Sequence, residues 1–447
     1  MQITHQADRA NLHGAAPDCP RTVSLLREMR SGCKRASAFL AILLLLGGCA
    51  STPEPVMERK VLAFPEPPDT PRFFYERTLR GSADVIPKDQ ESMSLRSFAT
   101  GESEDNGSQF SKPFAAVARK GRIYVSDTVT HTVMMLDPAN GKHKEIGTES
   151  PGLLGKPLGL ALDGQDNLYV ADVSRKWAMV YDRDGNYLRG IGGPEYLDHP
   201  SAVAVNPEGT RLFVVDVGSV QGKPEFHRVQ AFDAKTGKHL FAIGTRGAGD
   251  GQFNLPRAAA IGPDGMLYVV DSGNFRVQVF DQNGKFLRKF GTVGTRLGQF
   301  ARPKGIDIDK QGNLYISDAS HANFQIFDSQ GQLLMFVGSR GKESERAKYL
   351  LPGMVGLDED GRVYMVDQGY RKVDIYRPAN LKEDEGSLGK AIKALLAIKP
   401  GGKGTDKDKD KDKDKDKDKD KDKDKDKDKD KGKEKGKEKE KEAAEKK

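Results

Sequence analysis

The sequence predicts an all-β fold, a six-bladed β-propeller with four-stranded blades. One pattern occurs six times: a strand led by proline, a Tyr-Val-like strand ending in aspartate, and two further strands separated by Gly or Asp turns. The strand-ending aspartates are 44 to 55 residues apart. A repeat of this length is typical of radially arranged sheets, because one blade cannot bury both of its faces alone. The leading prolines are Pro113, Pro157, Pro200, Pro256, Pro303 and Pro352, and the aspartates are Asp127, Asp172, Asp216, Asp271, Asp318 and Asp367.

The strands of the repeat resemble those of the NHL family. The second strand is Asn-Leu-Tyr-Val-Ala-Asp at residues 167–172 and Asn-Leu-Tyr-Ile-Ser-Asp at residues 313–318, and the third is Arg-Val-Gln-Val-Phe at residues 276–280. The resemblance runs from about residue 110 to Pro378 and implies the propeller fold. It does not imply an activity, since NHL-type propellers include protein binders, RNA binders and a few enzymes.

The last blade lacks a strand, and an upstream segment supplies the missing one. Three strands precede Pro378, and no fourth follows it. Residues 72–81, Arg-Phe-Phe-Tyr-Glu-Arg-Thr-Leu-Arg-Gly, end like Leu188-Arg189-Gly190 in blade two. We expect this segment to be the outer strand of blade six, which leaves no open sheet edge. The predicted propeller therefore spans residues 72–378.

The N-terminal region predicts export and lipidation. Residues 1–48 contain Arg30, Lys34 and Arg35 and then an apolar run from Ala36 to Leu46, which is too short to span a bilayer. A start at Met29 would give a more conventional signal peptide. Leu46-Gly47-Gly48-Cys49 resembles the bacterial lipobox, which implies acylation of Cys49. The alternative is a buried helix that ends in a chance cysteine.

The resemblance to lipoproteins also indicates a location. Ala50, not Asp, follows the lipidated cysteine, which by analogy with lipoprotein sorting favours the outer membrane of the bacterial cell envelope, facing the periplasm. The only other cysteines, Cys19 and Cys33, would leave with the signal peptide, so the mature chain can form neither a disulfide nor a Cys metal site. Residues 49–71 are rich in proline and predict a semi-extended tether.

Two segments follow the propeller. Within residues 379–404, Leu388, Ile392, Leu395 and Leu396 recur at helical spacing and predict a short amphipathic helix over residues 387–399. We expect it to pack on the ring, with a membrane-surface helix as the alternative. Residues 405–447 alternate Asp with Lys and end in a Lys-Glu-rich stretch, which predicts a disordered tail. This tail either only solubilises the protein or makes weak contacts with peptidoglycan or another anionic envelope polymer.

The charge of the predicted ring argues against nucleic acid as a partner. The whole chain has a formal net charge of +7, but residues 71–378 hold 39 Lys and Arg against 37 Asp and Glu. Binding of nucleic acid needs a clustered positive field. We therefore expect a membrane, through the lipid, and another envelope protein as partners.

The repeated aspartates and the histidines are candidates for binding or catalysis. An aspartate that recurs once per blade is most simply a turn device that accepts backbone N–H groups and pairs with a basic residue, as Asp172 with Arg175, Asp271 with Arg276 and Asp367 with Arg371. The alternative is a binding mouth lined by these loops. Related propeller enzymes hold metal at the channel, which makes His131, His199 and His321 weak zinc candidates on one face.

We expect these histidines to be surface residues. We expect the chain to have no catalytic residue and no cofactor other than the lipid on Cys49, with Zn or Ca left open. The best candidate contact surface is in the loops after the second strands: Trp177, Tyr370, and Phe226 and His227 at the end of an insertion over residues 218–227. A packing role for Trp177 is the alternative. The sequence thus favours a non-catalytic protein- or ligand-binding scaffold. A metal-dependent lyase or hydrolase at the channel mouth, or a structural role in an envelope complex, are the alternatives.

Overall fold

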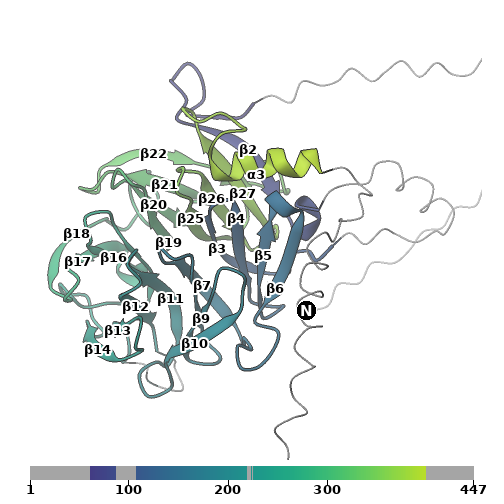
Figure 1. Cartoon of the computed structure of the whole chain (residues 1–447). Helices are drawn as coiled ribbons and strands as arrows, with labels where there is room; N and C mark the ends of the chain where they lie inside the picture. The colour runs from purple at the N-terminus through teal and green to yellow at the C-terminus, as the bar shows by residue number, and fades with distance from the viewer. Residues whose placement is uncertain (1–60, 87–106, 219–222, 224, 399–447) are drawn as a thin grey trace, which may run out of the picture. The chain divides into compact units, whose positions relative to one another are not determined.

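The chain forms six antiparallel sheets arranged around a common axis (Figure 1). The computed structural model describes residues 61–86, 107–218, 223 and 225–398. All of these belong to one compact unit that begins at Val61. The predicted signal peptide, Cys49 and the Asp-Lys tail lie outside the described residues.

Blades one to five each contain four consecutive strands, counted from the channel outward. The strands are β3 (Pro113–Arg119), β4 (Arg122–Asp127), β5 (Thr132–Asp137) and β6 (Lys142–Ile146); β7 (Pro157–Leu162), β8 (Leu168–Asp172), β9 (Trp177–Tyr181) and β10 (Tyr187–Gly192); β11 (Pro200–Val205), β12 (Arg211–Asp216), β13 (Arg228–Asp233) and β14 (His239–Ile243); β15 (Pro256–Ile261), β16 (Leu267–Asp271), β17 (Arg276–Phe280) and β18 (Phe286–Phe290); and β19 (Pro303–Ile308), β20 (Leu314–Asp318), β21 (Asn323–Phe327) and β22 (Leu333–Val337). The predicted four-stranded blades are confirmed.

Blade six closes the ring as the sequence predicts. It contains β25 (Pro352–Leu357), β26 (Val363–Asp367) and β27 (Lys372–Pro378), and its outer strand is β2 (Phe73–Leu79). β2 pairs with β27 from Phe73 opposite Pro378 to Leu79 opposite Val373. A further strand, β1 (Ala63–Phe64), pairs with β2. The predicted tether is therefore too long at its C-terminal end, because residues 61–71 belong to the folded unit and β1 extends its last sheet.

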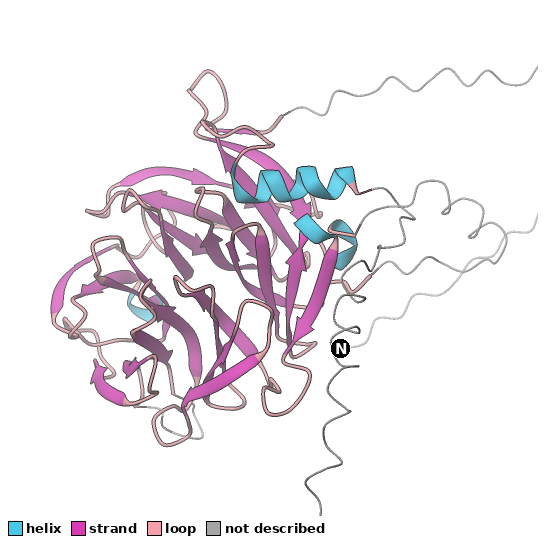
Figure 2. Cartoon of the chain, viewed as in Figure 1, coloured by secondary structure: helices cyan, strands magenta, loops and turns pink. Residues whose placement is uncertain are grey.

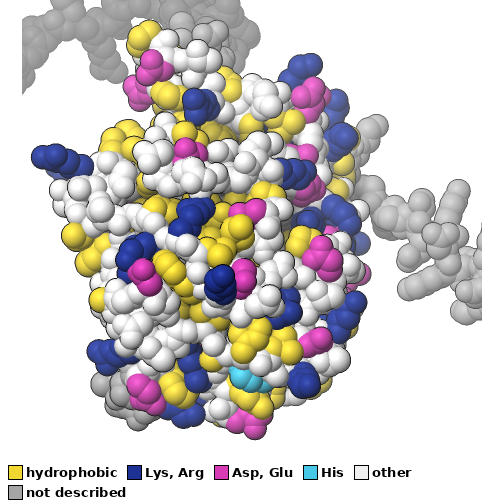
Figure 3. Space-filling model, turned by 90° about the vertical axis from the view of Figure 1, so that its left-hand side faces the viewer, with side chains coloured by type: hydrophobic (Ala, Val, Ile, Leu, Met, Phe, Trp, Pro, Cys, Tyr) yellow, Lys and Arg dark blue, Asp and Glu magenta, His cyan; other side chains and the backbone are white. Residues whose placement is uncertain are grey.

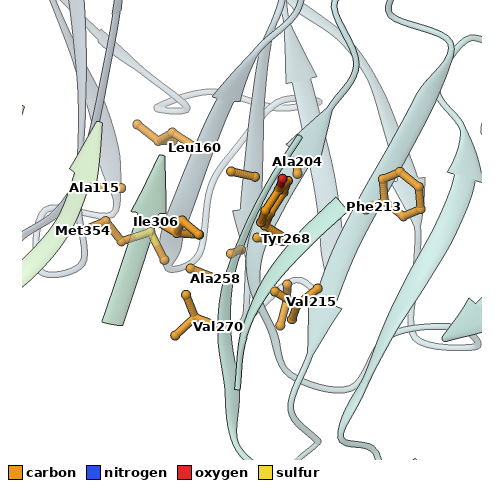
Figure 4. Close-up of a cluster of buried hydrophobic side chains, with 14 of the residues drawn as sticks. Ala115, Leu160, Ala204, Phe213, Val215, Ala258, Tyr268, Val270, Ile306 and Met354 are labelled. Carbon is orange, nitrogen blue, oxygen red and sulfur yellow. The ribbon is translucent and has the colours of Figure 1, made fainter. Parts of the chain in front are cut away.

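The inner strands hold small residues because they crowd together near the axis. A Cβ atom on Gly159 would lie 2.7 Å from the Cα of Ala202 in the next blade, and one on Gly356 would lie 2.2 Å from the carbonyl oxygen of Ala116. Side chains such as Ala258, Ile306 and Met354 fill the remaining space (Figure 4). Strands two and three of each blade are buried almost throughout, which fits sheets packed on both faces.

Short elements lie in the connections within and between the blades. The 3₁₀ turns are η1 (Ser82–Asp84), η2 (Pro138–Asn140) and η3 (Ser272–Asn274). Between blades five and six, β23 (Ser339–Arg340) and β24 (Lys348–Tyr349) form a parallel pair. Figure 2 shows the predominance of strands, with one α-helix lying against the ring.

That helix is α3 (Gly386–Ala397), and it confirms the helix predicted after the propeller. Leu388, Ile392 and Leu395 are buried, the first two in a core cluster with blade one and blade six side chains, whereas Leu396 is 82% exposed and lies off the apolar face assigned to it. Its first turn is held to blade six because the Ser387 N–H donates to Asp360 Oδ2 at 2.5 Å. The helix thus packs on the ring, as expected. Among the described residues no helix is long and apolar enough to cross a membrane.

Candidate functional site

The blade-leading prolines and the strand-ending aspartates lie at the same edge of the ring, which we call the loop face. Each proline pairs in register with the aspartate of its own blade, as Pro113 with Asp127 and Pro256 with Asp271. The connections from strand two to strand three therefore lie at this edge. The opposite edge, which we call the hairpin face, carries the connections from strand one to strand two, and α3 packs there against Gly121 and Asp360.

The six aspartates fix the loops of the loop face. Each is buried, and each carboxylate accepts N–H groups from the residues before strand one or after strand two. Asp172 shows the full pattern, with donors Gly155 at 2.5 Å and Lys156, Ser174 and Arg175 each at 3.0 Å. The turn-device interpretation is confirmed, and the result is a rigid platform of backbone.

The basic partners expected for these aspartates are only partly correct. Arg276 pairs with Asp271 through its Nε at 2.8 Å. Among the described residues, however, the side chains of Arg175 and Arg371 form no ion pair with Asp172 and Asp367. The carboxylates of Asp172 and Asp367 already accept backbone N–H groups, and Arg175 is exposed on the loop face.

The three histidines weighed as metal ligands belong to different blades. His131 is exposed in blade one, His199 is half-buried at the start of blade three, and His321 is half-buried in blade five with its Nε2 buried and without a hydrogen-bond partner among the described residues. The backbone N–H of His199 donates to Asp216 Oδ1 at 2.7 Å, and burial lowers the pKa of its imidazole.

A zinc centre needs three or four ligands that converge within about 2.1 Å of the ion. In the part of the chain that the structure describes, no three His, Cys, Asp or Glu side chains are grouped so that they could hold a metal ion. These residues do not fit a zinc or calcium centre, and no step of a metal-dependent reaction follows from them.

Trp177 lies in the position that a contact residue would need. It begins β9 at the loop face and is half-buried. With Tyr187 and Arg175 it lines a groove of about 310 Å³ between blade two and the connection from blade one, where Pro151 and Leu153 form the other wall. Its ring also packs over the backbone, since a Cβ atom on Gly190 would lie 3.0 Å from the indole. Trp177 therefore both packs on its blade and presents a surface to the groove.

The end of the insertion is more structural than expected. The ring of His227 is buried, and its Nδ1 accepts the N–H of Leu255 at 3.1 Å, so it is not available as a contact residue. Phe226 is clamped by cations, with the Arg228 guanidinium carbon 3.2 Å and the Lys223 ammonium 4.7 Å from its ring centroid. Residues 219–222 and 224 of the insertion lie outside the described residues.

Tyr370 is also partly committed to the fold. It is half-buried in the loop after β26, and its hydroxyl donates to the carbonyl oxygen of Gly341 at 2.9 Å. Trp177 and Tyr370 belong to blades two and six, and the structure does not bring them into one contact patch. Of the four predicted contact residues, Trp177 is the one that lines a groove.

The central channel holds a cavity of about 480 Å³ whose walls combine small apolar side chains with charged ones. All six inner strands contribute, through residues such as Leu160, Ala202 and Ile306 (Figure 4). Asp307 lies in the wall, and burial raises its pKa to about 6. Its carboxylate accepts the N–H groups of Ile308 at 2.9 Å and of Leu357 at 2.7 Å, which joins blades five and six. This acid therefore has a structural use.

Basic side chains around the loop-face mouth of the channel were missed by the sequence analysis. They flank the leading prolines, as Lys112 and Arg302 on one side and Arg257 and Lys304 on the other. The sequence shows these basic residues directly beside the blade-leading prolines. This signal went unused because the overall count of charges in the ring is balanced, and a balanced count hides a local cluster.

Comparisons with known proteins support the architecture. A family model described as a 6-bladed beta-propeller matches residues 261–334, which lie in blades four and five. No curated protein is similar to this chain in sequence at a significant level.

Solved structures with a similar course include a streptogramin B lyase (13% identity, TM-score 0.45, covering 60% of this chain and 94% of that one) and a gluconolactonase from Xanthomonas campestris (18%, 0.45, 60% and 88%). A Bacteroides thetaiotaomicron protein of unknown function is also similar (17%, 0.49, 68% and 75%). Similarities this distant do not transfer an activity or a substrate. The chain is a six-bladed β-propeller with four-stranded antiparallel blades and one C-terminal helix.

Proposed function

We propose that this chain is a lipid-anchored protein of the bacterial cell envelope, whose NHL-type propeller binds another envelope protein through its loop face without catalysis. The observation that carries this proposal is the groove at Trp177. A half-buried tryptophan, a tyrosine and an exposed arginine line one open groove on a backbone platform fixed by buried carboxylates. Trp, Tyr and Arg are the residue types that most often anchor protein interfaces.

The groove suits an extended segment or a loop of a partner protein. Its Pro151 and Leu153 wall and the indole offer apolar surface, and Arg175 at the rim offers an unpaired charge that could meet an acidic residue. The hairpin face is less available for the same purpose, because α3 already covers part of it.

The resemblance to NHL repeats is compatible with a binding role, which many propellers of that family have. It does not by itself decide between binding and catalysis. The matching motifs, residues 167–172 and 313–318, contain the buried second strands β8 and β20. These motifs explain the fold and carry no chemistry of their own. The lyase or hydrolase alternative has no supporting group of metal-ligand side chains among the described residues.

Lipidation rests on the sequence Leu46-Gly47-Gly48-Cys49. Twelve residues from Cys49 to Lys60 would join the lipid to the folded unit that begins at Val61. A chain of that length reaches at most about 40 Å, at about 3.5 Å per residue. The proposal therefore keeps the propeller close to the membrane and limits its partner to proteins in or near the same membrane.

Lipidation is tested by Cys49→Ser in the native host. The variant should lose incorporation of labelled fatty acid and leave the membrane fraction, because two or more acyl chains are needed for stable anchoring. Unchanged membrane retention together with unchanged labelling would overturn this part of the proposal.

Binding at the groove is tested by affinity capture of envelope proteins with three variants. Arg175→Glu and Trp177→Ala should each reduce capture of the same partner at least tenfold. Lys235→Glu is the matched control, because Lys235 is exposed in the turn between β13 and β14 on the hairpin face. The Arg175 side chain forms no hydrogen bond or ion pair with the described residues, so Arg175→Glu should melt like the parent protein. Undiminished capture by Arg175→Glu and Trp177→Ala would contradict the assignment of this groove.

A further inference from the structure

The loop-face mouth of the central channel is rimmed by positive charge. Four of its residues directly precede a leading proline, and two directly follow one; they are Lys112, Lys156, His199, Arg257, Arg302 and Lys304. Blades one to five each contribute at least one of them. Because all inner strands begin at the loop face and line one channel, these side chains surround a single opening.

The backbone of this rim is fixed before any ligand arrives. The N–H groups of Lys112, Lys156 and Arg302 donate to the buried aspartate of their own blade at 2.8, 3.0 and 2.9 Å. His199 does the same at 2.7 Å. The nearest acids therefore hold the backbone of the rim and, in the part of the chain that the structure describes, form no ion pair with its cationic side chains, although the charge of Asp367 still acts on Lys304. A preorganised site of this kind loses little free energy to ordering when it binds.

The cations at the mouth have no partners within the described part of the chain. The side chains of Lys112, Lys156, Arg257, Arg302 and Lys304 form no ion pair, hydrogen bond or ring contact there. On the outer side of the ring, by contrast, Lys and Arg are interspersed with Asp and Glu (Figure 3). The five cations of the mouth lie at the same edge as the six buried aspartates but, among the described residues, form no ion pair with any of them.

These charges are close enough to repel one another. Burial, together with the charges of Arg302, Arg257 and Lys112, lowers the pKa of Lys304 to about 8, with Asp367 opposing them more weakly. Desolvation of its guanidinium by the surrounding mouth also lowers the pKa of Arg257, although the residue as a whole is exposed, and Arg302 adds to the effect.

His199 faces the same opening from blade three. Burial lowers its pKa; Asp198 and Asp216 oppose this, while Lys156 and Arg257 add to it. Groups from five blades therefore share one field across the mouth. An anion placed among them would remove this repulsion.

The side chains along the channel determine at which end an anion would bind. In blade six Gly353 takes the position that Lys304 has in blade five, and a Cβ atom there would lie 2.6 Å from the carbonyl oxygen of Phe114. Directly inside the mouth the walls are small and apolar, with Ala115, Ala202 and Ala258. The far ends of the inner strands and the hairpins beyond them contribute five acids to the cavity, against the two cations Arg119 and Lys310; the acids are Asp307, Asp309, Asp358, Glu359 and Asp360. The field along the channel therefore favours a negative charge at the loop-face mouth and disfavours it at the other end.

We propose that this mouth binds a compact oxyanion with two or more negative charges, a phosphate ester or a polycarboxylate, held by Lys304, Arg257 and Arg302. Guanidinium groups bind both kinds of oxyanion with two parallel hydrogen bonds, and the ammonium adds a point charge. The cavity behind the mouth leaves room for an uncharged part of the ligand. This site is separate from the groove at Trp177 and needs no protein partner.

The test measures binding of pyrophosphate and of citrate to the purified full-length chain by calorimetry and by thermal shift. Both titrations use chloride at matched ionic strength as the reference. We expect at least one of the two anions to bind in one-to-one ratio and raise the melting temperature. Lys304→Met and Arg257→Gln should each weaken that binding at least tenfold. Lys235→Met removes one exposed positive charge on the hairpin face and should leave it unchanged.

The stability of the free variants separates a ligand site from a structural one. If the cations serve binding alone, Lys304→Met should melt at the same temperature as the parent protein or higher, because it removes a half-buried charge surrounded by like charges. Binding of neither anion, or equal weakening by Lys235→Met, would overturn the proposal. Arg257 is exposed, so Arg257→Gln decides the question even if Lys304→Met does not fold.

Discussion

Glu76 is the residue whose loss should most clearly reveal how the ring closes. It lies in β2, and its carboxylate meets the guanidinium of Arg362, with Nε 2.8 Å from Oε2. The two side chains are 5% and 0% exposed. Arg362 also donates from Nη2 to the carbonyl oxygen of Glu385, at 3.0 Å, so it links the closing strand to the segment before α3. Glu76→Gln would leave this arginine buried without its ion-pair partner, with Asp358 as a remaining nearby acid.

The magnitude follows from the burial of the pair. Removing one member of a buried ion pair costs about 3–5 kcal/mol, because the other charge remains desolvated. Glutamine keeps one acceptor oxygen, so we expect the lower end, about 3 kcal/mol. For a domain of this size each kcal/mol shifts the melting temperature by about 2–3 °C, which gives a loss of about 6–9 °C. Circular dichroism melts and urea titrations measure both quantities.

The matched control is Glu145→Gln in β6, the outer strand of blade one. Glu145 is half-buried and forms no ion pair among the described residues, so its substitution should stay within about 0.5 kcal/mol. Adding Arg362→Met to Glu76→Gln should recover part of the loss, since replacing both members relieves the unpaired charge. Equal losses for Glu76→Gln and Glu145→Gln would refute the role of this pair in closure.

Two further predictions concern the closing strand and the channel mouth. A chain that begins at Asp84 should be markedly less stable than one that begins at Thr70, because it lacks β2 and leaves the backbone groups of β27 unpaired; deletion of residues 406–447 should leave the melt unchanged, and equal melting of the two truncated chains would show that the ring closes without β2. The pKa of Lys304 is about 8 in the folded protein and about 10.5 when unfolded. Between these values the unfolded chain binds more protons, so the penalty from this group is full below pH 8 and is lost as the pH rises towards 10.5. Lys304→Met should therefore stabilise the protein more at pH 7 than at pH 10, and a pH-independent difference would contradict the assigned pKa.

The repeat fold and its closure could be predicted because they depend on residues at fixed places in each copy. Proline at the start of strand one and aspartate at the end of strand two form a register pair in every blade, so a periodic sequence reports a periodic structure. The closing strand was recognisable for the same reason, since blade six has three consecutive strands of the pattern instead of four.

The candidate sites could not be predicted as fully because they are not periodic. The wall opposite Trp177 comes from Pro151 and Leu153, which belong to the connection from the previous blade. His227 follows a long insertion and was expected to be a contact residue. It is instead buried, and its Nδ1 accepts the N–H of Leu255, which precedes the next blade. The cations of the mouth come from four blades, and only the ring geometry brings them together. Contacts between blades are set by packing, which the local sequence does not encode.

The central claim, that the loop face binds a partner in the envelope, is tested most directly by site-specific photocrosslinking in the native host. A photoreactive amino acid at position 175 samples the groove, and one at position 396 samples the exposed side of α3 on the hairpin face, where Leu396 is 82% exposed. The account predicts a discrete adduct with one envelope protein from position 175 and none from position 396. Adducts from position 396 alone, or none from either position while the protein is folded and membrane-bound, would contradict it.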